Sequence, residues 1–267
     1  GPNGAGKTTL VRQITTELLP TSGTVKILGL DVAHEHTQVK ALLGVVPQEA
    51  TLFYYLTVYQ HLRIFAKLRG LIPRDSCVKA DQLVEELDLQ EHRNVQVGKL
   101  SGGLRRRVMV GIAAIAHPPV LVLDEPTTGL DPQSRRSLWS MLGRYREDGA
   151  LVLLTTHSME EAEVLCDRVG IIQGGRLLAL DTVSQLRSNY GLQFKVTYFP
   201  DESNFDGPSS SGLTKEGTTL YGADDRELVA RVQGLGIQQF SVMQTNLEDV
   251  YLAMTGGTKE FTEEFND

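Results

Sequence analysis

The residues Gly1-Pro2-Asn3-Gly4-Ala5-Gly6-Lys7-Thr8-Thr9 match the phosphate-binding pattern G-x-x-x-x-G-K-[ST]. In such a loop the glycines leave room for backbone N–H groups to surround a phosphate. The ammonium group of Lys7 can contact β- and γ-phosphate oxygens, and the hydroxyl of Thr8 can bind Mg²⁺. These residue types therefore predict a site for a nucleoside triphosphate and its magnesium ion.

Two carboxylates stand at the end of an apolar run. Val120–Leu123 has the composition of a buried parallel strand, and Asp124 and Glu125 follow it directly. Asp124 can hold Mg²⁺ through water, and Glu125 can orient or deprotonate a water molecule that attacks a phosphate. Taken alone, two such acids would more often be surface residues. Because the same chain carries a phosphate-binding loop, we expect them to belong to a hydrolytic site.

Ser101-Gly102-Gly103 opens a helix that is predicted to run to about Ala116. The amino end of a helix presents free N–H groups and the positive end of its dipole, and two glycines let a phosphate approach closely. This predicts a second anion site. The cations that follow, Arg105, Arg106 and Arg107, oppose the dipole preference. We expect two of them to be solvated or paired with acids, and an anion-holding role stays open for the third.

These side chains need regular elements to hold them in place. Apolar runs predict strands near 24–28, 42–46, 120–123 and 150–154. Apolar periodicity and end signals predict a helix from the phosphate loop to Pro20 and further helices over 57–68, 73–87, 101–116, 131–149 and 158–166. Capping boxes are expected at Thr57-x-x-Gln60 and Ser158-x-x-Glu161. Strands that alternate with helices predict an α/β fold with a mainly parallel sheet.

The composition changes after about Gly191. Before this point, Gly174-Gly175 predicts a hairpin over 169–179. After it, strands near 194–199, 218–221 and 237–244, a loop over 200–217 and helices over 225–235 and 246–254 predict a small α+β module. We therefore expect a nucleotide-binding domain over 1–190 with a helical insert at about 55–117, an accessory domain over 191–256 and an acidic tail over 257–267.

The bulk composition excludes several classes of protein. The chain has 267 residues, 41% hydrophobic and 22% charged, as expected of a globular protein with a sizeable core. Its net charge of −7 argues against broad binding to nucleic acid. Its apolar runs are far shorter than the roughly 20 residues needed to cross a bilayer. Cys77 and Cys166 lie far apart in the sequence, so we expect reduced thiols and no metal or redox role.

Over residues 1 to about 185, the order and spacing of these motifs resemble the ATP-binding cassette (ABC) ATPase family. The resemblance implies a P-loop NTPase fold with ATP and Mg²⁺ as cofactors. It implies that Glu125 is the general base and that Gln48 contacts both Mg²⁺ and the attacking water. It also implies that His157 contacts the γ-phosphate. The expected metal set is therefore Thr8, Gln48 and Asp124.

The resemblance further implies a pair of ATPase subunits. Ser101, Gly102 and Gly103 would then contact the ATP that is held by the phosphate loop of a second copy, in a head-to-tail arrangement with two-fold symmetry. Asp131, in Gly129-Leu130-Asp131, resembles the family's aspartate at that interface.

One departure from the family's commonest pattern points to a subfamily. Leu104 stands where a glutamine is usual, and basic residues follow it. This pattern looks like that of the daunorubicin-resistance-like subfamily, the cassettes of drug and lipid exporters. The membrane subunits of that subfamily are of the ABC-2 type. The segments 135–139 and 247–256 strengthen this similarity. The family's first strands and its adenine-stacking aromatic lie upstream of the phosphate loop, so we expect a chain truncated at this motif that binds ATP weakly.

These expectations favour the ATPase subunit of an ABC exporter. It would lie at the cytoplasmic face of the membrane, drive a separate ABC-2 type integral membrane permease, pair with a second ATPase subunit and bind no nucleic acid. Three alternatives stay open: a soluble ABC ATPase that does not serve transport, an importer ATPase, and a fragment of a chain fused to its own membrane domain.

Overall fold

The computed structural model describes residues 1–49, 52–198 and 218–255. The chain forms two compact units, which divide between His157 and Ser158. The domain boundary expected near residue 190 therefore stays a prediction. The predicted loop over 200–217 and the predicted tail over 257–267 lie outside the described residues.

A parallel sheet forms the centre of the first unit. Its strand order is β3 (Leu43–Val46), β4 (Val120–Asp124) and β5 (Leu151–Thr155). All five residues of β4, the central strand, are buried. This explains why residues 120–123 are continuously apolar, because helices cover both faces of the strand. The predicted α/β fold with a parallel sheet is confirmed.

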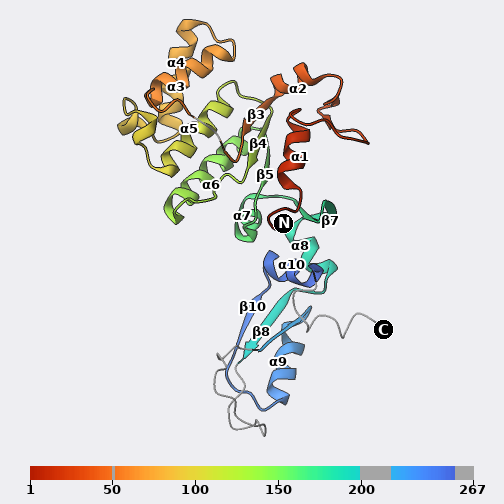
Figure 1. The fold of residues 1–267 in the computed structure, drawn as a ribbon. Helices are drawn as coiled ribbons and strands as arrows, with labels where there is room; N and C mark the ends of the chain where they lie inside the picture. The colour runs from red at the N-terminus through yellow and green to blue at the C-terminus, as the bar shows by residue number, and fades with distance from the viewer. Residues whose placement is uncertain (50–51, 199–217, 256–267) are drawn as a thin grey trace. The chain divides into compact units, whose positions relative to one another are not determined.

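Helices cover the two faces of this sheet (Figure 1). On one face, α1 (Lys7–Ile14) packs its Val11 against Val120 and Val122. On the other face lie α5 (Gly102–Ala114) and α6 (Pro132–Glu147), which are in contact with each other. Because side chains alternate along a strand, β4 serves both layers.

The helices predicted over 57–68 and 73–87 are present in this unit, whereas the helical insert expected at about 55–117 stays a prediction as a part of the domain. Thr57 caps α3 (Val58–Leu68) with a complete capping box, as predicted, and α4 (Pro73–Glu86) follows it. Gly70, with a φ of 92°, ends α3 where a left-handed residue is needed. The turns η1 (Gln90–His92) and η2 (Val97–Lys99) then lead to α5, on which α3 packs.

Several short elements differ from expectation. The strand predicted over 24–28 is a small antiparallel pair, β1 (Lys26–Ile27) and β2 (Leu30–Asp31). The helix α2 (His36–Leu42) was not predicted. The helix α1 ends at Ile14 rather than near Pro20, since Thr16 has a φ of 65° and cannot continue a right-handed helix.

The second unit contains two groups of elements. The predicted hairpin is present as β6 (Val169–Gln173) and β7 (Arg176–Asp181). An antiparallel sheet has the order β10-β8-β9. Its strands are β8 (Phe194–Tyr198), β9 (Thr218–Gly222) and β10 (Phe240–Gln244). The helix α9 (Asp225–Gly234) packs on this sheet through Leu228 and Val232.

Three further helices of this unit share a core. These are α7 (Met159–Leu165), α8 (Val183–Asn189) and α10 (Leu247–Thr255). Ala162, Leu186, Leu247 and Val250 are buried together in one cluster, so the last helix packs on segments that precede residue 190. In the part of the chain that the structure describes, no helix combines the length and apolar character needed to cross a membrane.

Candidate functional site

The phosphate-binding loop is a tight turn that leads into α1. Gly4 and Gly6 have φ values of 77° and 104°, and Gly6 is the N-cap of the helix. Residues with a Cβ rarely adopt such angles, so glycine is required at both positions. The backbone N–H of Ala5 donates to the carbonyl oxygen of Pro2 over 3.3 Å, which closes the turn.

Lys7 folds back over this loop. Its Nζ donates to the carbonyl oxygens of Gly1 at 2.8 Å and Pro2 at 3.0 Å. The same Nζ lies 3.5 Å from Oε1 of Glu125, and both side chains are only 9% exposed. A buried ammonium and a buried carboxylate therefore face each other across the loop, although 118 positions separate them in the sequence.

Glu125 is the centre of the polar contacts. Its Oε2 accepts a hydrogen bond from the Thr128 hydroxyl at 3.1 Å and lies 3.5 Å from Nε2 of Gln48. Nδ1 of His157 is 3.3 Å from the same oxygen, and the His157 side chain is half-exposed. The structure thus brings together four of the predicted residues, because each follows the carboxyl end of a parallel strand or opens α1 at the same edge.

The backbone of Glu125 is held in an uncommon conformation. Its φ is 46°, in the left-handed region. The N–H of Glu125 donates to the carbonyl oxygen of Thr155 at 3.1 Å. The Thr155 hydroxyl donates to Oδ1 of Asp124, which is buried. Thr155 and Thr128 were not predicted as site residues. For Thr155, the signal was available, since it ends a strand two residues before His157.

A cavity of about 290 Å³ opens over the phosphate loop. It is lined by Asn3, Gly4, Gly6, Lys7, Thr8, Thr9, Gln48 and Glu125. The lining combines backbone N–H groups, one cation and several oxygen ligands, which is the chemistry that a triphosphate with a divalent cation requires.

The predicted second anion site lies elsewhere in the same unit. Ser101 caps α5 by accepting a hydrogen bond from the N–H of Leu104 at 3.3 Å. Gly103 faces Ser134, because a Cβ at Gly103 would lie 2.3 Å from the Ser134 hydroxyl. Ser101, Gly102 and Asp131 are not among the described residues that line the cavity over the phosphate loop.

Asp131 caps the neighbouring helix. Its Oδ1 accepts from the Ser134 N–H at 2.9 Å, and its Oδ2 accepts from the Ser134 hydroxyl at 2.6 Å. The hydrogen bonds from Ser134 lower the pKa of this exposed carboxyl. Ser134 therefore joins the first turns of α5 and α6, so the serine-led helix and Asp131 stand side by side.

The basic residues after Leu104 have different environments. Arg107 lies 3.9 Å from Oδ2 of Asp88 and donates to the Leu87 carbonyl at 3.3 Å, as expected of a cation paired with an acid. Arg106 is buried, with 8% exposure, and its guanidinium donates to backbone carbonyl oxygens. The prediction offered an anion, solvent or acids as its surroundings and did not foresee carbonyl partners, because they come from distant loops.

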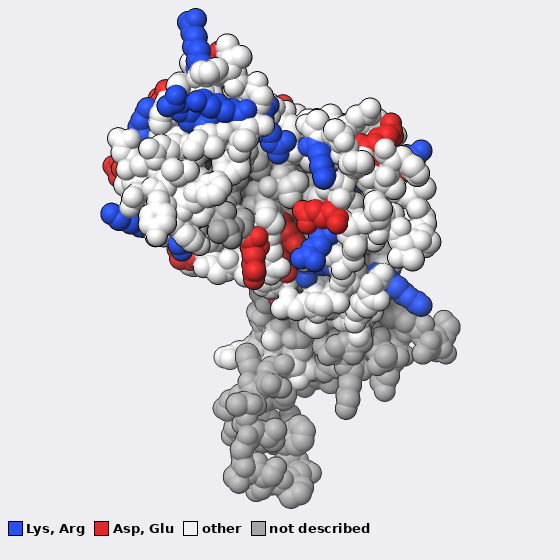
Figure 2. All heavy atoms as spheres, turned by 45° about the horizontal axis from the view of Figure 1, so that its top comes forward, with Lys and Arg blue, Asp and Glu red and all other residues white. Residues whose placement is uncertain are grey.

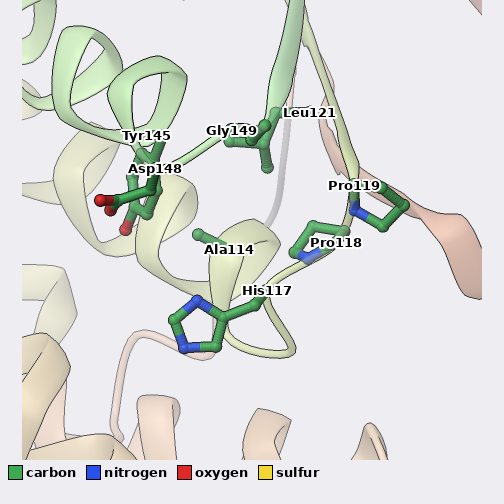
Figure 3. A pocket seen from close by; sticks show the side chains of 9 residues that line it. Ala114, His117, Pro118, Pro119, Leu121, Tyr145, Asp148 and Gly149 are labelled. Carbon is green, nitrogen blue, oxygen red and sulfur yellow. The ribbon is translucent and has the colours of Figure 1, made fainter.

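A second, smaller cavity of about 120 Å³ is shown in Figure 3. Pro119 and Ala150, which directly precede β4 and β5, line it, so it lies at the amino ends of these strands. The Tyr145 hydroxyl in its wall is buried without a hydrogen-bond partner among the described residues, and burial raises the pKa of that phenol. None of the predicted site residues is among its described lining.

The charged side chains on one face of the molecule are mixed. Figure 2 shows Lys and Arg in separate groups on this face, with Asp and Glu beside several of them. In the described residues, no group of three or more His, Cys, Asp or Glu side chains is arranged to hold a metal ion by itself.

Comparisons with known proteins agree on one family. Residues 1–128 match the family described as ABC transporter. The chain is 38% identical to the Nod factor export ATP-binding protein I of Burkholderia thailandensis, over 96% of this chain and 86% of that protein. It is 36% identical to the ATP-binding cassette sub-family A member 7 of Rattus norvegicus over 94% of this chain, and it spans 12% of that relative's length.

A solved structure described as the ATP binding subunit of an ABC transporter is also similar. It superimposes with a TM-score of 0.64 at 30% sequence identity, over 72% of this chain and 80% of that one.

Proposed function

This chain belongs to the ABC transporter family and is an ATPase of the ATP-binding cassette type, and from this premise we propose that it is the motor subunit of an exporter. It binds and hydrolyses ATP, pairs with a second ATPase subunit, and drives a separate ABC-2 type permease from the cytoplasmic face of the membrane. The observation that carries this proposal is the position of Glu125, whose carboxylate lies within 3.5 Å of Lys7, Gln48 and His157.

The cavity over the phosphate loop fits the triphosphate of ATP. Backbone N–H groups of residues 4–8 and the Lys7 ammonium can together stabilise the β- and γ-phosphate oxygens. Mg²⁺ fits the same place, because the Thr8 hydroxyl and the Gln48 amide oxygen are hard ligands in the lining and the Asp124 carboxylate is adjacent to Glu125. When bound, the ion would neutralise charge on the phosphate oxygens.

Glu125 supplies the general base in this proposal. Its carboxylate takes a proton from water while the water oxygen bonds to the γ-phosphorus and the bond to the β-phosphate oxygen breaks. Thr128 and His157 both contact Oε2 and so orient the carboxylate. Gln48 reaches the same oxygen and can place the water, and the Lys7 ammonium stabilises the charge that develops on the transferred group.

The pairing of two subunits is supported by the exposed helix start at Ser101. Ser101 and Gly102 are exposed, and a Cβ added at Gly102 would meet no atom within 4 Å, so a phosphate can approach there. The free N–H groups at the start of α5 favour the binding of an anion. This helix start does not line the cavity over this chain's own phosphate loop. We assign this helix start, with Asp131 beside it, to ATP held by a second copy.

Export is supported by the similarity to a Nod factor export ATP-binding protein over nearly the whole chain. The motifs after Leu104 favour an ABC-2 type permease as the partner. We further propose that residues 191–256 act as an accessory domain of the nucleotide-binding domain over 1–190.

Two substitutions test the proposed function. We expect Glu125→Gln to lower kcat by about 100-fold or more, because a general base contributes at least that factor. ATP binding should survive, and the variant should accumulate as an ATP-bound dimer in size-exclusion chromatography with light scattering.

Lys7→Ala is the matched control, because it removes the phosphate contact and should prevent both binding and dimer formation. Equal ATPase rates for the wild type and Glu125→Gln would contradict the assignment of the base. ATP binding by Lys7→Ala with wild-type affinity would contradict the assignment of the nucleotide site.

A further inference from the structure

Arg106 occupies an unusual position for a cation. It lies in the second turn of α5, on the helix that starts at Ser101, and only 8% of its surface is exposed. A buried guanidinium is costly unless its donors are satisfied. Its donors reach two loops that lie more than 15 residues away along the chain in either direction.

Every N–H of the Arg106 guanidinium has a carbonyl acceptor. Nε donates to Pro126 at 2.7 Å. Nη1 donates to Pro47 at 3.1 Å and to Gln48 at 3.5 Å. Nη2 donates to Asp124 at 3.0 Å and to Glu125 at 2.9 Å. Since a guanidinium has five donors in a fixed planar fork, these five acceptors use its whole capacity.

The five acceptors belong to the two segments that carry the proposed chemistry. Pro47 and Gln48 follow β3. Asp124 is the last residue of β4, and Glu125 and Pro126 follow it. Gln48 and Glu125 are thus held through their own carbonyl groups by one side chain. Arg106 touches neither the phosphate loop nor Lys7 in any of these hydrogen bonds.

The backbone at Glu125 needs such support. A non-glycine residue in the left-handed region costs on the order of 1 kcal/mol and persists only when its surroundings fix it. The N–H of Glu125 is fixed by Thr155, and its carbonyl oxygen is fixed by Arg106. Together these contacts determine where the carboxylate points, which the contacts of Oε2 with Thr128 and His157 then refine.

We propose that Arg106 is a positioning residue for ATP hydrolysis: it sets the distance between Gln48 and Glu125 and ties both to the helix that begins at Ser101. This inference rests on the proposed function of Glu125 and extends it to a side chain whose five hydrogen bonds described above go to backbone carbonyl oxygens. It also explains why an arginine occurs in this turn, against the helix dipole. Its partners are carbonyl oxygens, for which a cationic donor makes stronger hydrogen bonds than a neutral one.

The test compares Arg106→Gln and Arg106→Lys with a matched control, Arg107→Gln. The control removes an arginine one position along the same helix. Arg107 contacts the Leu87 carbonyl and Asp88, which directly follow α4. We expect Arg106→Gln to lower kcat by about 10- to 100-fold, as for a small misplacement of reacting groups. KM for ATP should change by less than about threefold, since the phosphate loop is not touched.

Arg106→Lys keeps the charge and up to three donors, so it should recover part of the lost kcat. Arg107→Gln should keep kcat within about twofold of the wild type. A wild-type kcat in Arg106→Gln would overturn the proposal. So would a loss in Arg106→Gln that Arg107→Gln shares, because the effect would then be a general one of the helix.

A double-mutant cycle separates positioning from folding. If Arg106 acts through Glu125, Arg106→Gln should lower the residual kcat of Glu125→Gln by less than about twofold. A further drop of 10-fold or more in that background would contradict the proposal. A wild-type chain without ATPase activity would instead contradict the proposed function. In that case, amide hydrogen exchange in the two loops tests the positioning role of Arg106.

In that measurement, Arg106→Gln and Arg106→Lys should speed exchange in peptides that cover residues 45–49 and 124–128. Peptides over residues 1–9 should be unchanged, because the five carbonyl acceptors of Arg106 lie in the loops after β3 and β4 or at the end of β4. Unchanged exchange in both loops would overturn the positioning role even in an inactive chain.

Discussion

Gly44 in β3 offers a sharp test of how the sheet meets α5. A Cβ at this position would lie 2.3 Å from the carbonyl oxygen of Ala113, 2.7 Å from Cδ2 of Leu121 and 2.8 Å from Cγ of Pro118. An ordinary C···O contact is about 3.3 Å or longer, so α5 or β3 would have to move by about 1 Å. The atom approached most closely belongs to the helix backbone and cannot rotate away.

The expected cost of Gly44→Ala follows from this clash. Overpacking of a core costs about 1–3 kcal/mol of stability. We take the upper end of this range, because the added Cβ would clash with three neighbouring atoms and one of them belongs to the backbone. Replacing glycine returns about 0.5–1 kcal/mol through the unfolded chain, because the φ of Gly44 is not in the left-handed region. The net loss is about 2 kcal/mol, which lowers Tm by about 4–8 °C for a unit of this size.

Tryptophan fluorescence is a suitable assay, since Trp139 on α6 is the only tryptophan in the sequence and belongs to the same unit. Gly143→Ala is the matched control. It makes the same chemical change within α6, where an added Cβ meets no atom within 4 Å, and should raise stability by about 0.5–1 kcal/mol. A Tm for Gly44→Ala at or above that of the wild type would refute the close packing of β3 under α5.

Two further predictions concern buried polar groups. His61 is fully buried and its Nε2 accepts from the N–H of Phe53 at 3.0 Å, while burial lowers its pKa. As the pH falls, His61 therefore becomes protonated in the unfolded chain before it does so in the folded chain. The free energy of unfolding should then decrease below about pH 6.5 by up to about 1.4 kcal/mol per pH unit. In denaturant titrations at several pH values, His61→Gln should show a smaller loss than the wild type; an equal loss would exclude His61 as the source. In the second unit, the Asp249 carboxylate accepts from Lys195 Nζ at 2.9 Å and from the N–H of Asn246 at 2.8 Å. Asp249→Asn should lower the calorimetric stability of that unit by about 2 kcal/mol, and the exposed Glu248→Gln on the same helix should change it by less than about 0.5 kcal/mol.

Much of the fold could be predicted because its signals are local. The buried strand over 120–123, the hairpin at Gly174-Gly175 and the capping box at Thr57 were each encoded within a few residues. The helices α2 and α8 were missed, since each has seven residues and too few turns to establish a periodicity. For α8 a local signal existed, as Thr182 accepts from the N–H of Gln185 in a Thr-x-x-Gln segment like the one at Thr57.

The candidate site was predictable by residue but not by contact. Motif order identified Lys7, Gln48, Glu125 and His157, yet no spacing indicated that the Lys7 ammonium would face Glu125 at 3.5 Å. The left-handed backbone of Glu125 and the five carbonyl partners of Arg106 depend on how distant loops pack. The role of Asp249 on α10 was hidden for the same reason, because its partner Lys195 lies on β8, far away in the sequence.

The register of the parallel sheet is what turns separate motifs into one site. Val46 is aligned with Leu123, and Asp124 is aligned with Thr155. With this pairing, the three strands end within one or two residues of each other, so Gln48, Glu125 and His157 leave the sheet at one edge. A shift of one residue in β4 would turn Asp124 to the opposite face and bring either Leu123 or Glu125 opposite Thr155, depending on the direction of the shift. Gly44 permits α5 to pack closely over this register, and Arg106 on the same helix binds both loop backbones where the strands end. The position of the proposed general base therefore depends on the packing of α5 against β3 at Gly44 as well as on the immediate neighbours of Glu125.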